Sequence, residues 1–235
     1  MRLCTTQVLR VVLFLMIAAS AYAQRGQFGI DAGETTDKFG GLAKTTSPVG
    51  DVNGEIIVIR GNQKQGSPSI VGGGEVRFPT DTGSHANEFA VYGGVIFHAL
   101  NNALSIGFHA QVRKMDLPTS IVDNQFFTRK KLEVLEIPLF AKYKFGPDKH
   151  VFVEVQGAPE FRPRFRNSGS SSLLPNPEFD HGYFIRGSLG YDFGKWYAKA
   201  TYQTRYFRFT PVVGNPLGLY NWRSDFATGG VGVNF

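Results

Sequence analysis

The sequence predicts an all-β protein, folded as an antiparallel up-and-down transmembrane β-barrel. Two observations predict this fold. Apolar and polar residues alternate with a period of two along most of the chain, in segments of about ten residues. The connectors between these segments alternate between short and long. A barrel with short turns at one end and longer loops at the other produces both patterns, whereas a Greek-key sandwich is not expected to produce the second.

Eight segments carry the alternation clearly. In residues 104–114, for example, Leu104, Ile106 and Phe108 fall on one face, and His109 and Gln111 fall on the other. Period-two alternation is typical of β-strands. The expected strands are residues 68–78, 88–98, 104–114, 131–145, 151–165, 182–193, 196–209 and 222–235. The expected short connectors are residues 99–103, 146–150 and 194–195, and the long ones are 79–87, 115–129, 166–181 and 210–221.

Two more segments near the N-terminus could add a strand pair. These are residues 27–34 and 52–60, and they would raise the strand number from eight to ten. Residues 56–59 are continuously apolar rather than alternating, so they depart from the strand pattern of the other segments. The barrel domain is expected to cover residues 24–235, and its part from 24 to 67 would hold this N-terminal pair and a long loop.

Residues 1–23 are predicted to be a secretory signal peptide. Arg2 and Arg10 bracket a charged start, residues 11–19 form a short apolar core, and Ala21-Tyr22-Ala23 fits an A-x-A cleavage site. The core is shorter than the roughly 20 residues that span a bilayer. The alternative is a buried N-terminal helix of the folded domain. Cleavage after residue 23 would remove the chain's single cysteine, at position 4.

Composition agrees with strands and turns and gives no sign of nucleic-acid binding. The chain has 28 glycines, 14% aromatic residues and 19% charged residues. Its net charge of +6 falls to +4 once the two signal-peptide arginines are removed, which is only mildly basic. A mature chain without a long apolar helix could enter a membrane only as a closed barrel, because lipid offers no hydrogen bonds and every backbone group must find its partner within the protein.

The position of the aromatic residues predicts which face of the barrel points outward. A soluble lipocalin-like barrel would place its apolar face inside, and a membrane barrel inverts this arrangement. Aromatic residues gather at both ends of the expected strands, as bilayer interfaces favour. The inversion is therefore predicted. The aromatics near the short turns are Phe97, Tyr143, Phe145, Phe193, Trp196 and Phe235, and those near the long loops are Phe78, Phe89, Phe161, Tyr206 and Trp222.

Inversion would place charged side chains of both signs inside the lumen. In a barrel of eight strands the interior is only wide enough for side chains, and these charges are expected to pair because an unpaired buried charge is costly. A narrow passive pore is the alternative, and ten strands would favour it. The predicted lumen charges are Glu75, Arg77, Arg113, Glu136, Lys142, Lys144, Glu154, Glu160, Arg162, Arg186, Asp192, Lys199 and Arg205.

The end of the chain, TGGVGVNF, resembles the C-terminal recognition signal of bacterial outer-membrane barrels. Val231, Val233 and Phe235 share one face of this segment, and the barrel assembly machinery is the partner that would read them. The segment LEIPLFAKYKF (residues 135–145), the turn GPDKH and the strand VFVEVQGAPEF also resemble the outer membrane protein β-barrel domain family of small, porin-like bacterial barrels. This resemblance implies an integral outer-membrane barrel, exported through the periplasm, and no shared reaction.

No constellation of residues predicts catalysis, a cofactor or a metal. The histidines lack metal-ligand spacing. Asp180 and His181 could belong to an outer-membrane enzyme acting on lipid or peptide, but an ordinary loop pair is the favoured interpretation. A structural, adhesive or surface-interaction role is therefore expected. Its partners would be outer-membrane lipid and lipopolysaccharide. The paired N–H donors of an arginine guanidinium match the phosphate oxygens of lipopolysaccharide. The predicted lipopolysaccharide contacts are Arg129, Arg166 and Arg208.

Overall fold

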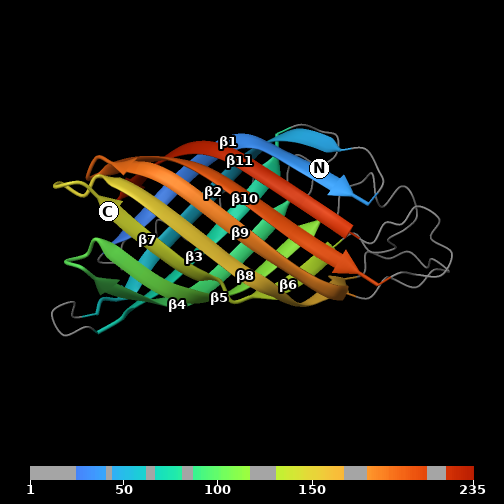
Figure 1. The fold of residues 1–235 in the computed structure, drawn as a ribbon, viewed down its shortest axis with the longest axis horizontal. Coiled ribbons are helices and arrows are strands. Elements are labelled where there is room, and N and C mark those ends of the chain that lie inside the picture. The colour runs from blue at the N-terminus through green and yellow to red at the C-terminus, as the bar shows by residue number, and fades with distance from the viewer. Residues whose placement is uncertain are drawn as a thin grey trace, which may run out of the picture.

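The described residues form one closed, antiparallel β-barrel of ten strands (Figure 1). The all-β barrel predicted from the sequence is confirmed, and the additional N-terminal strand pair is present, so the barrel has ten strands. Among the described residues, no helix is long and apolar enough to cross a membrane. The computed structural model describes residues 25–40, 44–61, 67–80, 87–116, 131–166, 179–210 and 221–235, without the side chains of 162–166. The predicted signal peptide lies outside these ranges.

Each strand pairs with its neighbours in the sequence, and the first and last strands pair to close the ring. This is the up-and-down topology that the sequence predicts. The chain passes through β1 (Gly26–Phe39), β2 (Thr45–Ile59), β3 (Ser69–Pro79), β4 (Glu88–Ala99), β5 (Leu104–Asp116), β6 (Lys131–Glu136), β7 (Leu139–Phe145), β8 (Val151–Arg166), β9 (Phe179–Asp192), β10 (Trp196–Phe209) and β11 (Asn221–Asn234).

Strands β6 and β7 are two halves of the single strand expected over residues 131–145. Both pair with β5 in one continuous register, from Gln111 opposite Glu136 to Phe108 opposite Leu139. The ladder is interrupted at Pro138, which has no backbone N–H to donate. Its carbonyl still accepts a hydrogen bond from the backbone of His109, at 3.0 Å. The proline therefore breaks the pairing without shifting it.

The two N-terminal segments are full strands, longer than the sequence predicts. The continuous apolar run in residues 56–59 has a structural cause, because the register of β2 against β3 shifts between Ile57 and Ile59. Such a bulge turns consecutive side chains to the same side of a strand. Val58 and Ile59 are accordingly both exposed.

The strict alternation of connector lengths does not extend to this N-terminal part. Residues 40–44, at the long-loop end, are a short connector, and residues 60–68, at the short-turn end, exceed the other turns there. Closure of the barrel depends on pairing between neighbouring strands and not on connector length. The pattern therefore predicts the topology but not each connector.

The exterior of the barrel is apolar and its lumen is polar. On β9, Leu189 points outward and is 57% exposed, whereas the adjacent Ser188 points inward and is 8% exposed. The same alternation runs through most of the other long strands, except β2, where the four consecutive residues from Val49 to Val52 are buried. An apolar exterior around a polar interior is the arrangement of a membrane barrel and the reverse of a soluble one.

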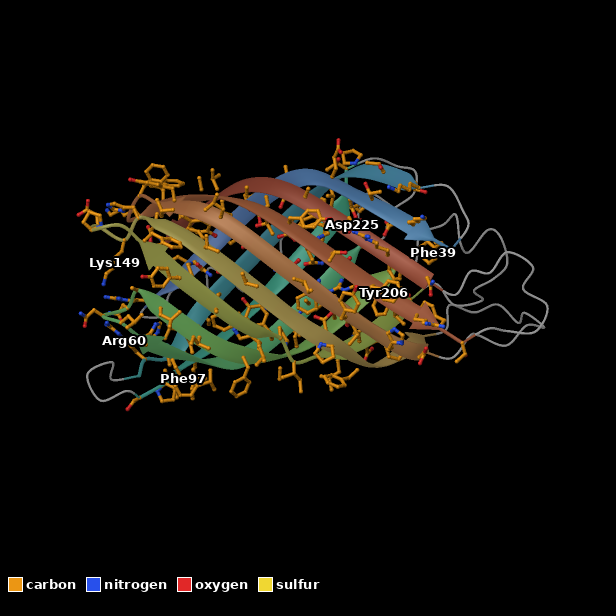
Figure 2. The ribbon with its side chains drawn as sticks, viewed as in Figure 1. Phe39, Arg60, Phe97, Lys149, Tyr206 and Asp225 are labelled. Atoms are coloured by element: carbon orange, nitrogen blue, oxygen red, sulfur yellow. The ribbon has the colours of Figure 1, made fainter. Side chains whose placement is uncertain are left out.

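Outward-facing aromatic residues gather at both ends of this apolar exterior. The six predicted for the short-turn end are all exposed; Figure 2 shows Phe97 projecting outward there. At the long-loop end, Phe89, Phe161 and Tyr183 are exposed. Trp222 was wrongly placed in that group: it is buried on the lumen face of β11, where its Nε1–H donates to Asp37 Oδ1 at 2.9 Å.

Candidate functional site

Four arginines and five carboxylates fill the middle of the lumen. We call this set the lumen network. Its members come from eight of the strands, β2 to β6 and β8 to β10, and most of them are almost completely buried, so the barrel wall and the neighbouring side chains take the place of water around them. The lumen network consists of Arg77, Arg113, Arg186, Arg205, Asp51, Glu75, Glu88, Glu136 and Glu160.

Arg205 pairs with three carboxylates of the lumen network. Its Nε donates to Glu160 Oε1 at 2.8 Å, its Nη2 donates to Glu136 Oε1 at 2.9 Å, and its Nη1 donates to Glu88 Oε2 at 3.3 Å. One guanidinium on β10 therefore joins carboxylates from β4, β6 and β8. Charge-assisted hydrogen bonds of this kind are about twice as strong as neutral ones.

Glu75 and Arg113 extend the lumen network around the rest of the barrel. Arg113 lies 2.9 Å from Glu88 Oε2, 3.3 Å from Glu136 Oε1 and 3.4 Å from Glu75 Oε2. Glu75 accepts from Arg77 at 2.8 Å and from Arg186 at 2.8 Å on both of its oxygens. The carboxylates and arginines thus form one connected layer across the lumen.

An apolar layer covers the lumen network on its long-loop side. We call it the outer cluster. Trp222 stacks on Phe39 and on Phe207, each with ring centroids 5.2 Å apart, and Arg205 Nη1 lies 3.3 Å from Met115 Sδ, so the two layers are in contact. Figure 2 shows Phe39 at this end. The outer cluster consists of Phe39, Met115, Leu132, Val134, Phe207, Phe209 and Trp222.

On its short-turn side the lumen network faces a cavity of about 390 Å³, which we call the vestibule. Gly26, Asn234 and Phe235 line its mouth at the short-turn end. Deeper in the lumen, its wall includes Glu55 and His109. The lumen is therefore hollow in its short-turn half and filled by side chains beyond.

Most of the predicted lumen charges lie in these layers. Glu75, Arg77, Arg113, Glu136, Glu160, Arg186 and Arg205 converge in the lumen network. Three other pairs lie around the vestibule, namely Lys142–Glu154 at 3.9 Å, Lys144–Asp192 at 2.9 Å and Lys199–Asp31 at 3.3 Å. The side chain of Arg162 lies outside the described residues.

Several functional residues were missed by reasoning from sequence. Asp31, Asp51 and Glu55 are on the two N-terminal strands, and Glu88 begins β4. A signal for two of them existed, because Asp51 and Glu55 share one face with Asn53 once residues 45–59 are treated as a strand. The outer cluster was also missed, although Phe207 and Phe209 continue the face that carries Arg205.

The predicted assembly signal lies on the exterior at the closing strand pair. Val231 and Phe235 are exposed and Val233 is half-buried. The backbone of Phe235 exchanges two hydrogen bonds with Gly26, at 2.7 and 2.9 Å, so the last residue takes part in closing the barrel. Recognition of these residues by the assembly machinery stays a prediction.

The predicted lipopolysaccharide contacts are only partly described. Arg208 is exposed near the long-loop end, and its Nε lies 3.5 Å from Asp180 Oδ2. Arg129 and the side chain of Arg166 lie outside the described residues. Asp180 Oδ2 also lies 3.2 Å from His181 Nδ1, and both side chains are about half exposed rather than directed into the lumen.

No family model and no curated protein sequence matches the chain. Several solved structures resemble it at low identity. Neisserial surface protein A is 12% identical, with 89% of this chain and 97% of that chain covered and a TM-score of 0.41. The KdgM porin is 10% identical over 88% and 99%, with a TM-score of 0.39. The outer membrane protein OprG from Pseudomonas aeruginosa is 12% identical over 89% and 96%, with a TM-score of 0.30. By its own strand pairing and apolar exterior, the chain is a closed ten-stranded transmembrane β-barrel.

Proposed function

We propose that this protein is an integral outer-membrane barrel of a Gram-negative envelope that does not conduct and has no catalytic activity. Its role is structural or interactive, with the short turns in the periplasm and the long-loop end at the cell surface. The observation that carries this proposal is the filled lumen. The lumen network and the outer cluster lie one behind the other along the barrel axis. The side chain of Arg205, where the two layers meet, is 1% exposed.

A surface role is supported by the lengths of the connectors between the strands. Four connectors of substantial length join strands at the end that holds the outer cluster. Connectors between the strands of a rigid scaffold are where binding residues concentrate. These connectors, which would meet an adhesive partner at the cell surface, are residues 80–87, 117–130, 167–178 and 210–220.

A narrow passive pore is the alternative that the filled lumen disfavours. Barrel protein reconstituted into a planar lipid bilayer is expected to give no stepwise single-channel currents, because the buried side chains of the lumen network and the outer cluster lie in the path of an ion. Heat-modifiable migration of the same preparation serves as the control that the barrel is folded. Regular current steps from folded, inserted protein would contradict the closed-lumen proposal.

Lipopolysaccharide is the proposed partner at the long-loop end. Replacing Arg129, Arg166 and Arg208 together with glutamine is expected to leave folding in detergent unchanged and to remove the thermal stabilisation that added lipopolysaccharide gives the parent. Arginine's paired N–H donors match phosphate oxygens, and glutamine carries no charge. Lys149→Gln with Lys195→Gln, at the opposite end, is the matched control. Equal stabilisation of parent and triple variant would refute the contact.

A further inference from the structure

We propose that the vestibule is a binding site for a small organic cation, an ammonium or guanidinium compound, that enters from the short-turn end and uses Glu55 as its counter-ion. This inference goes beyond the proposed surface role, because it concerns the opposite end of the barrel. It rests on a carboxylate and a histidine that face the cavity without the partners that the neighbouring polar groups have.

Glu55 differs from the other carboxylates around the vestibule in having no lysine or arginine partner among the described residues. Glu154, Asp192 and Asp31 each lie within 4.0 Å of a lysine ammonium group. Among the described residues, no lysine or arginine comes that close to Glu55, whose Oε2 accepts a hydrogen bond from the Tyr92 hydroxyl at 3.3 Å. The side chain of Glu55 is only 18% exposed. A carboxylate so poorly solvated is stabilised by a cation beside it.

His109 adds a second group without a partner on the same wall. Its side chain is 8% exposed, its ring lies between those of Tyr92 and Phe140, and its Nε2 is 3.8 Å from Glu55 Oε2. Neither ring nitrogen has a hydrogen-bond partner among the described residues. A neutral imidazole offers one acceptor, and leaving it unpaired in a buried site is costly. A ligand N–H group could therefore be shared by Glu55 and His109.

The rings around these two groups also favour a cation. Tyr92 and Phe140 flank His109, and Phe152 and Tyr197 line the same cavity. Aromatic faces attract cations, and the vestibule already holds one such contact, with Lys142 Nζ 4.2 Å from the centroid of the Phe152 ring. An anion would find the described lysines of this cavity already paired with carboxylates.

The shape of the cavity sets the size and route of the ligand. Its volume of about 390 Å³ falls within the range of pockets that hold small molecules. The lumen network closes its inner end, so a bound solute would leave by the mouth through which it entered. No group of three or more histidine, cysteine or acidic side chains among the described residues is arranged for a metal ion, so the geometry favours an organic cation.

Benzylamine is a suitable probe, because it joins an ammonium group to an aromatic ring, and benzyl alcohol is its neutral counterpart. Isothermal titration of the folded barrel in detergent micelles is expected to give saturable binding of benzylamine and none of benzyl alcohol. Glu55→Gln keeps the size of the side chain and is expected to weaken benzylamine binding by about tenfold or more, as loss of a charge-assisted hydrogen bond does. Glu34→Gln, on the exposed face of β1, is the matched control and should bind as the parent does.

A second variant keeps the proposal testable if Glu55→Gln does not fold. His109→Phe preserves a ring between Tyr92 and Phe140 and removes both nitrogens, so it should also weaken benzylamine binding. Heat-modifiable migration reports folding for each variant. Equal binding of benzylamine and benzyl alcohol to the parent would overturn the proposal, and so would unchanged benzylamine affinity in a folded Glu55 or His109 variant.

Discussion

Replacing Arg205 with methionine is expected to lower the free energy of unfolding by about 3–5 kcal/mol, the range for removing one partner of a buried ion pair. Arg205 holds Glu136 and Glu160 at 2.9 and 2.8 Å, and both carboxylates are buried. Without the guanidinium, Glu160 would lose the ion pair with Arg205 and Glu136 would keep only its pair with Arg113, in a space that water hardly enters. Urea titration of the barrel in lipid vesicles, followed by the change in tryptophan fluorescence, measures the loss.

Arg223→Met provides the matched control for this experiment. Arg223 also pairs with a carboxylate, at 2.9 Å from Asp225 Oδ2, but its side chain is 55% exposed. Exposed pairs contribute about 0–1 kcal/mol, so this variant should unfold close to the parent. Equal destabilisation by the two substitutions would mean that the lumen network does not support the barrel more than a surface pair does.

The sequence predicts the barrel well where one face of a strand is uniformly apolar. On β9, for example, Ile185 and Leu189 alternate with Arg186 and Ser188, and this alternation fixes which side chains point outward. The same alternation continues on both sides of Pro138, although the strand pairing is interrupted there. Lipid on one side and packed polar side chains on the other enforce the period of two.

The pattern fails where a local irregularity or an interior packing need overrides it. The bulge near Ile57 removes the period-two alternation from residues 56–59, because the consecutive side chains of Val58 and Ile59 both face outward. Tryptophan is a residue type that bilayer interfaces favour, yet Trp222 packs inside the barrel against Phe207 and Phe39. Alternation assigns Trp222 to the inward face together with Phe226. The prediction from aromatic residues at strand ends uses only the position of Trp222 along the strand and not the face on which it lies.

The candidate site could be predicted only in part. Periodicity places Glu75, Arg113 and Arg205 on the lumen face, but it does not tell which of them meet across the barrel. Contacts such as Arg205 with Glu88 join residues more than one hundred positions apart and depend on strand tilt and register. The vestibule was not predictable for the same reason, since it exists where facing side chains leave space between them.

The central claim is that the apolar face of this barrel points into lipid, and two adjacent residues of β8 test it most directly. Val155 is exposed on the outer face and pairs with Gly187, midway along β9 between Tyr183 and Tyr191. Gln156 is the next residue and lines the vestibule. A lysine at either position adds the same charge to the same strand, once toward lipid and once toward the polar lumen.

Unfolding free energies of the two variants in lipid vesicles are the decisive measurement. Val155→Lys is expected to lose about 2–4 kcal/mol relative to the parent, the range for a lysine at the bilayer midplane. Gln156→Lys should lose much less, because its ammonium group would lie in the vestibule beside Glu154 rather than in hydrocarbon. The opposite order, with Val155→Lys tolerated and Gln156→Lys strongly destabilising, would contradict the assignment of the two faces.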